Sequence, residues 1–108
     1  MRMIMKVSIP VEAGNAAVLN GSLGPTIQQI LEDLKPEAAY FTDEDGKRTG
    51  FIFFDLKDSS QIPAIAEPWF LAFNASVGLR PAMNVQDLQA GMPGMTRAVE
   101  KFGKTVAA

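Results

Sequence analysis

The chain contains no histidine and no cysteine. Structural zinc sites, thiolate nucleophiles, Ser-His-Asp triads and acid–base catalysis by imidazole all use one of these residues. We therefore exclude these chemistries together and expect no cofactor and no metal site. Haem held by Tyr40, or a hard cation held by carboxylates, is chemically open, but no motif supports either.

A basic surface is also lacking. Ten Lys and Arg residues stand against twelve Asp and Glu residues, which makes the formal net charge −2. Nucleic-acid-binding proteins place clustered Lys and Arg against phosphates, whereas Lys47-Arg48 is the only adjacent basic pair in this chain. We therefore expect no nucleic-acid partner.

Long apolar runs are missing as well. The segment from Met1 to Ile9 is interrupted by Lys6 and Ser8, so it does not resemble a signal peptide, and no stretch is long enough to cross a bilayer. We expect a cytoplasmic protein with no membrane partner. The length of 108 residues predicts one domain over residues 1–108, with a core at about 2–90 and a C-terminal helical extension at 91–108.

The most informative segment that is present runs from Thr49 to Leu56 and is apolar on both sides. Because alternate residues of a strand point to opposite faces, Phe51 and Phe53 face one way, and Ile52 and Phe54 face the other. A strand of this kind belongs inside a sheet and needs a covering layer on each face.

The remaining pattern predicts a ferredoxin-like α+β fold, βαββαβ, with an antiparallel four-stranded sheet and both helices on one face. Asp45-Gly46 predicts a tight hairpin turn, and Pro68 should kink the second main helix. The expected sheet order is fourth, first, third and second strand. We expect strands at 2–9, 38–42, 49–56 and 75–83, main helices at 26–34 and 62–73, a weaker helical segment at 13–20 broken from the next one around Gly21–Pro25, and C-terminal helices at 84–90 and 95–102.

Helices on one side leave the other face of the sheet uncovered. That face carries Ile4 and Lys6, together with either the Phe51 and Phe53 pair or the Ile52 and Phe54 pair. A patch of this size is larger than soluble monomers usually expose. We therefore predict a homodimer through the open sheet face. The alternative is that the C-terminal helix folds over the sheet of its own chain.

Four segments make the chain similar to the dimeric α/β barrel superfamily, and most similar to an uncharacterised bacterial branch of it. The resemblance covers roughly residues 3–90 and implies a ferredoxin-like dimer whose sheets face each other. Members of this superfamily include cofactor-free monooxygenases, isomerases and haem-handling enzymes, but the haem-handling branch depends on a histidine. No catalytic residue can be transferred from it. The segments are Leu23-Gly-Pro-Thr-Ile-Gln-Gln-Ile30, Lys35-Pro-Glu-Ala-Ala-Tyr-Phe41, Asp45-Gly-Lys-Arg-Thr-Gly50 and Ala66-Glu-Pro-Trp-Phe-Leu71.

Two groups of residues are candidates for binding a ligand. Near the kink at Pro68, Trp69 and Phe70 would form the wall of an apolar pocket beside Glu67, or else simply pack in the core. On the strands, unlike charges would meet inside the sheet–sheet space, or else form exposed ion pairs. The full set of candidate residues is Lys6, Tyr40, Phe53, Asp55, Glu67, Trp69, Phe70 and Arg80.

No acid–base pair or nucleophile is identifiable, so the sequence assigns no catalysis. We expect a small structural or regulatory homodimer, or one that binds a small apolar ligand. The alternative function is a cofactor-independent enzyme, similar to a monooxygenase or an isomerase, that acts on a small apolar or aromatic molecule. Only the fold resemblance supports that alternative.

Overall fold

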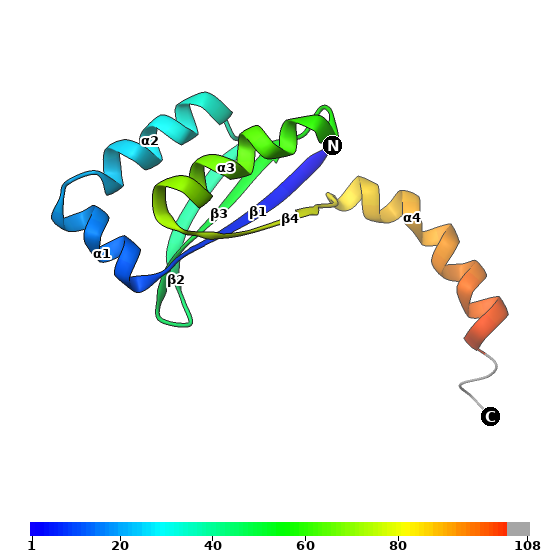
Figure 1. The fold of residues 1–108 in the computed structure, drawn as a ribbon. Helices are drawn as coiled ribbons and strands as arrows, with labels where there is room; N and C mark the ends of the chain where they lie inside the picture. Colours follow the sequence, from blue (N-terminus) through cyan, green and yellow to red (C-terminus); the bar gives the residue numbers. More distant parts are fainter. Residues whose placement is uncertain (104–108) are drawn as a thin grey trace.

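The structure is a computed structural model that describes residues 1–103, so the last five residues of the predicted C-terminal extension lie outside the described part (Figure 1). Four strands alternate with helices in the predicted order, and the C-terminus adds further helix. The elements are β1 (Arg2–Ile9), α1 (Val11–Leu19), α2 (Leu23–Leu34), β2 (Ala38–Glu44), β3 (Lys47–Asp55), a 3₁₀ turn (Ser59–Gln61), α3 (Ile62–Phe73), β4 (Ser76–Pro81), α4 (Val85–Ala98) and a π-helical turn (Val99–Gly103).

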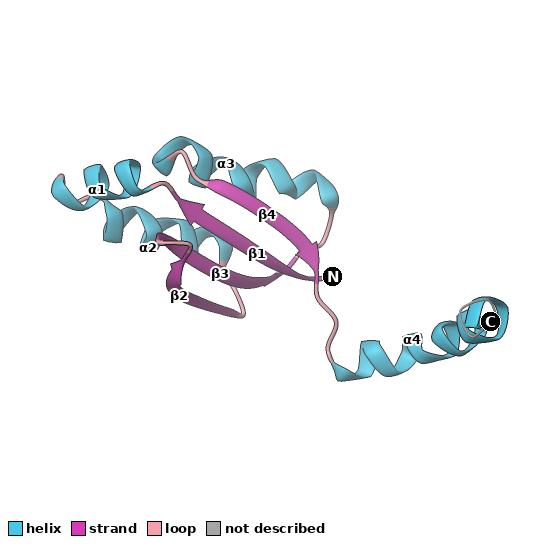
Figure 2. Ribbon diagram, turned by 90° about the horizontal axis from the view of Figure 1, so that it is seen from below, coloured by secondary structure: helices cyan, strands magenta, loops and turns pink. Residues whose placement is uncertain are grey.

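The sheet is ferredoxin-like, as the sequence predicted. All three strand pairs are antiparallel and the order is β2-β3-β1-β4. Helices α1, α2 and α3 lie on one side of the sheet, and the other side carries no helix (Figure 2). Figure 2 also shows α4 leaving the body beyond the end of β4. Among the described residues, no helix has the length and apolar character needed to span a membrane.

A two-residue turn sets the register of the β2–β3 hairpin. Asp45 and Gly46 both have positive φ, 53° and 74°, as the Asp-Gly pair predicted. The turn pairs Glu44 with Lys47, and the same register brings Phe41 opposite Gly50.

The core lies between the sheet and α1, α2 and α3. Alternate residues of β1 and β3 point toward these helices, and Met5, Ile52 and Trp69 are completely buried. The amphipathic stripe of α3 supplies Trp69 and Phe73 to this core. Ala66 and the α2 residue Ile30 are also buried there.

The open face of the sheet is the side that points away from the helices. The sequence left undecided which half of the third strand lies there, and the structure places Phe51 and Phe53 on it. Both are partly exposed, whereas Ile52 and Phe54 are buried against the helices. Tyr40 lies on the same face and is 66% exposed. The aromatic side chains expected on the uncovered side are therefore present.

The predicted break before α2 is confirmed, with α1 ending at Leu19 and Gly21 at φ 79°. Pro25 lies in the first turn of α2, where its missing N–H is tolerated. Helix α3 runs through Pro68 without interruption.

The prediction of two separate C-terminal helices was wrong. One helix, α4, runs from Val85 to Ala98 through Pro93. A proline removes a single backbone hydrogen bond, and the rest of a helix can continue around it. The predicted cap at Asn84 is present, since Asn84 and Asp87 form a reciprocal capping box. Helix α4 points away from the body, so it does not cover the sheet of its own chain (Figure 1).

Candidate functional site

Five of the residues predicted to bind a ligand lie on the open face. They are Lys6, Tyr40, Phe53, Asp55 and Arg80. Tyr40 and Phe53 make an edge-to-face contact with ring centroids 6.4 Å apart. This contact extends the apolar surface of the open face across β2 and β3.

The three predicted charges of the open face do not pair with one another. Lys6 forms an ion pair with Glu44. Asp55 Oδ1 accepts a hydrogen bond of 2.9 Å from the N-terminal amine of Met1, and this bond lowers the pKa of Asp55 below its usual range. Arg80 is exposed opposite Ile4. These charges are spread along the strands and do not converge on one point.

The aromatic pair predicted near Pro68 divides between the interior and the surface. Trp69 is completely buried and packs against Phe73 with ring centroids 6.1 Å apart. Phe70 is 40% exposed, and Glu67 is exposed. Adjacent residues of a helix point about 100° apart, so only Trp69 faces the interior.

Trp69 lines an apolar cavity between α2 and one end of the sheet, which we call the α2 cavity. Its volume is about 330 Å³. Three strands, β1, β2 and β3, and two helices, α2 and α3, contribute residues to its wall. Both the sheet layer and the helix layer therefore line the cavity. The lining consists of Val7, Ile9, Leu23, Ile27, Phe41, Thr42, Arg48, Thr49, Gly50 and Trp69.

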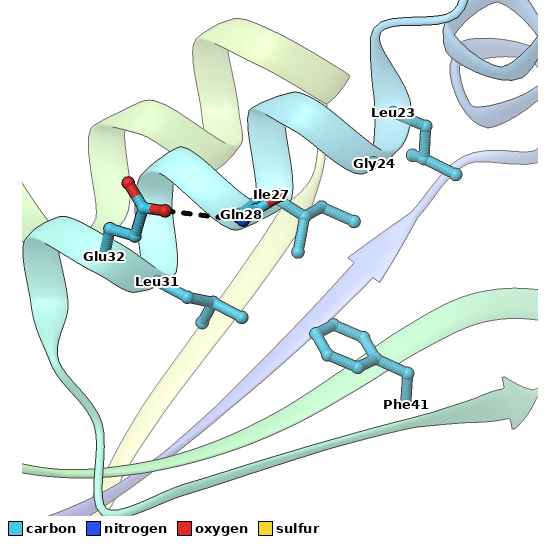
Figure 3. A pocket seen from close by; sticks show the side chains of 7 residues that line it. All are labelled: Leu23, Gly24, Ile27, Gln28, Leu31, Glu32 and Phe41. Carbon is cyan, nitrogen blue, oxygen red and sulfur yellow. Dashed lines mark hydrogen bonds between the residues drawn. The ribbon is translucent and has the colours of Figure 1, made fainter.

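A shallower recess adjoins the α2 cavity on its outer side and has a volume of about 490 Å³. The two spaces share Leu23, Ile27 and Phe41. Figure 3 shows Leu23, Ile27 and Leu31 extending from α2 on the side that faces Phe41 of β2. Phe41 therefore lies between the α2 cavity and the outer recess.

Gly50 allows Phe41 to lie close to the sheet. A Cβ atom at Gly50 would lie 2.9 Å from the ring of Phe41, which is closer than real Cβ contacts. The ring thus occupies the space above the cross-strand glycine, and its position limits one side of the α2 cavity.

Four lining residues of the α2 cavity carry polar side chains, namely Thr42, Arg48, Thr49 and Trp69. The indole Nε1 of Trp69 is buried and has no hydrogen-bond acceptor among the described residues. Arg48 Nη1 donates a hydrogen bond of 3.2 Å to Asn15 Oδ1, and Arg48 forms no ion pair with the described part of the chain. A Cβ atom at Gly14 would lie 2.5 Å from Arg48 Nη1, so the guanidinium rests directly against α1.

The residues around the α2 cavity suit binding better than catalysis. Its lining includes no carboxylate, amine or phenol that could act as a general acid or base. Within residues 1–103, no three Asp or Glu side chains gather in a way that could hold a metal ion. The arrangement can enclose an apolar group and donate hydrogen bonds to an acceptor.

Sequence reasoning found Trp69 but missed Arg48, Phe41, Leu23 and Ile27 as members of one cavity. One part of the α2 cavity, the pairing of Phe41 with Gly50, could have been predicted from the sequence. The Asp45-Gly46 turn pairs residues symmetrically about itself, which brings Phe41 opposite Gly50. The approach of Arg48 to α1 depends on helix packing, for which the sequence holds no comparable signal.

No family model and no curated protein matches this chain. Among solved structures, it is similar to a formyltetrahydrofolate deformylase from Pseudomonas putida KT2440, with 13% identity and a TM-score of 0.49. The match covers 76% of this chain but 29% of the deformylase. The chain therefore spans less than a third of that enzyme, and at this level of similarity the match carries no argument about function.

Proposed function

We propose that the protein is a homodimeric small-ligand-binding module, and that the α2 cavity holds an apolar molecule carrying a carboxylate or a similar anionic group. The observation that carries this proposal is that one cavity is lined by Trp69, whose indole Nε1 has no acceptor among the described residues, and by Arg48, an exposed guanidinium that forms no ion pair within residues 1–103.

The size and lining of the cavity support a small apolar ligand. Small-molecule sites have volumes of roughly 300–1,000 Å³ and are mostly apolar with a few polar groups that orient the ligand. At about 330 Å³, the α2 cavity lies at the lower end of this range. The adjoining recess would accommodate the part of a longer ligand that extends past Phe41.

The polar groups support a ligand that accepts hydrogen bonds. A buried donor without an acceptor costs roughly 1–3 kcal/mol. Trp69 Nε1 is such a donor, and because Trp69 is completely buried, a ligand oxygen would reach it only with a shift of the surrounding side chains. The guanidinium of Arg48 presents paired N–H groups that match the geometry of a carboxylate. Arg48 is positively charged and no lining residue is acidic, so the cavity disfavours a cationic ligand.

The open face supports the homodimer. Tyr40, Phe51, Phe53 and Ile4 form an apolar surface there that no helix within residues 1–103 covers. Packing the same face of a second copy against it would bury both surfaces in a closed, two-fold arrangement. The α2 cavity lies on the opposite side of the sheet, so each copy would keep its own cavity.

Trp69 is the only tryptophan, so its emission reports directly on the cavity. Octanoate, added below its critical micelle concentration, should shift this emission saturably, whereas octylamine, which has the same chain and the opposite charge, should not. Arg48→Gln should weaken octanoate binding by about tenfold, as expected for a charged hydrogen bond. The matched control is Lys47→Gln, which removes the neighbouring charge and should leave the affinity unchanged.

Equal affinities for Arg48→Gln and Lys47→Gln, or no saturable shift with octanoate, would refute the proposed ligand class. Native mass spectrometry of the unliganded protein tests the homodimer independently, because a monomer at micromolar concentration would contradict it.

A further inference from the structure

Helix α4 and the following turn carry a regular apolar stripe that we call the α4 seam. Its members are separated alternately by three and four residues, which is the spacing of the a and d positions of a coiled coil. They are exposed by between 42% and 66%. The seam consists of Val85, Leu88, Met92, Met95 and Val99.

The residues beside the α4 seam suit close contact with another helix. In the same heptad, the flanking e and g positions are occupied by small or uncharged residues, Gln89, Gly91, Thr96 and Ala98. The charged residues all fall at the outer positions b, c and f. These are Asp87, Arg97, Glu100 and Lys101. The segment therefore has one narrow apolar face, with the charged residues on the opposite face.

Helix α4 has little support from the rest of its own chain. None of its residues is buried, and it projects from the body (Figures 1 and 2). Its interior contains Gly91, Pro93 and Gly94, which are the residue types least favourable to helix. Isolated helices of this length are marginal in water even with good helix formers. We therefore expect α4 to need a packing contact along the α4 seam to remain helical.

We propose that the α4 seam pairs with the α4 seam of a second copy of the chain, forming a two-helix contact that clasps the dimer. A stripe limited to a and d positions is narrower than the apolar face of a helix that packs on a sheet, so another helix fits it better than the open face does. The same seam on both copies satisfies a two-fold dimer, in which each patch meets itself.

The seam supplies part of the area that a stable dimer interface needs. At roughly 100 Å² for each half-exposed large side chain, two paired seams bury about 1,000 Å². Stable interfaces bury about 1,200 Å² or more, so the seam alone falls short. This inference therefore rests on the proposed homodimer, whose sheet faces would supply the remaining area and hold the two helices at high effective concentration.

Cysteine cross-linking tests the contact cleanly, because the chain has no cysteine of its own. Met92→Cys places a thiol in the middle of the seam, where its twin is near in either relative orientation of the helices. Ala90→Cys places one on the outer side of the same turn. With a short bis-maleimide, Met92→Cys should become mostly covalent dimer while Ala90→Cys stays at least tenfold less cross-linked.

The result separates the clasp from the dimer itself. A dimer by light scattering in which the two cysteine variants cross-link equally would refute the clasp and leave the homodimer standing. A monomer by light scattering would refute both proposals.

A second measurement does not depend on cross-linking. Amide hydrogen exchange within α4 should be slow in the dimer, and it should become fast in the seam variant Leu88→Glu/Met95→Glu. The matched outer-face variant Gln86→Glu/Arg97→Glu should retain the protection. Equal protection in the two variants would refute pairing through the seam.

Discussion

Helices α3 and α4 share two sequence features but lie in different surroundings. Each is amphipathic, and each contains an interior proline, Pro68 or Pro93. The stripe of α3 buries Trp69 completely, whereas Met95 on the stripe of α4 is 59% exposed. The difference lies in the neighbouring elements, because α3 is flanked by β3 and β4 of the sheet on which it packs, whereas the described part of the chain after α4 contains only the turn Val99–Gly103. The periodicity of apolar residues thus identifies the face of a helix that needs a packing partner. The neighbouring elements in the chain decide which partner is within reach.

The largest effect should come from removing the α3 anchor. Trp69→Ala should lower the free energy of unfolding by about 3–5 kcal/mol, because a buried aromatic side chain leaves a cavity that its neighbours fill only in part. Urea unfolding followed by circular dichroism measures this change. Phe70→Ala is the matched control on the outer side of the same turn and should cost less than about 1 kcal/mol. Similar losses for both would contradict the burial of α3 described above.

Two Gly→Ala substitutions should have effects on stability that are intermediate in size and opposite in sign in the two regions. Gly50→Ala should destabilise the body by about 1 kcal/mol, because the new Cβ would lie 2.9 Å from the ring of Phe41 and displace it. In α4, Gly94→Ala meets no atom closer than 3.9 Å and should increase helix stability by about 0.5–1 kcal/mol. Denaturation measures the first change and the helical circular dichroism signal measures the second. Stability changes of the same sign at both positions would contradict the difference between the packed body and the exposed helix α4.

The smallest effect should be at the entrance to α3. Asp58 accepts a hydrogen bond of 3.0 Å from the backbone N–H of Ser60, and bonds to Ser60 lower the pKa of Asp58. A pKa lowered by folding gives stability that is present above the unfolded pKa and is lost as pH falls through the folded pKa. Asp58→Ala should therefore lower Tm slightly at about pH 7, where the carboxylate is charged, and have less effect at about pH 2.5. An equal decrease at both pH values would exclude the charged cap as the cause.

Local patterns predicted the body well because several independent signals agreed. Alternation identified β1, a strand-length run apolar on both faces identified β3, Asp45-Gly46 determined the hairpin, and right-handed crossovers left a single strand order. The C-terminal prediction failed because the helices expected at 84–90 and 95–102 form one helix that runs through Gly91 and Pro93. Neither residue prevents a helix from continuing when its neighbours on both sides are helical.

The candidate site was predicted only in part. Trp69 was identified, because an aromatic residue on the apolar side of a helix points toward the core. For Lys6, Asp55 and Arg80 the sequence left open a meeting in the sheet–sheet space or exposed ion pairs, and in the structure Lys6 pairs with Glu44 and Asp55 with the N-terminal amine. Such pairings depend on which long side chain reaches which strand end, and a single sequence carries no signal for that.

The order of residues alone determined the four strands, their arrangement and the uncovered aromatic face, because alternation and turn chemistry act over a few neighbouring residues. Only the tertiary structure decided that Arg48 rests on α1 and that Phe41 and Trp69 border the same cavity. It also decided that α4 extends away from the body. These features depend on how separate elements pack together, and packing is settled by the shapes of side chains that lie far apart along the chain.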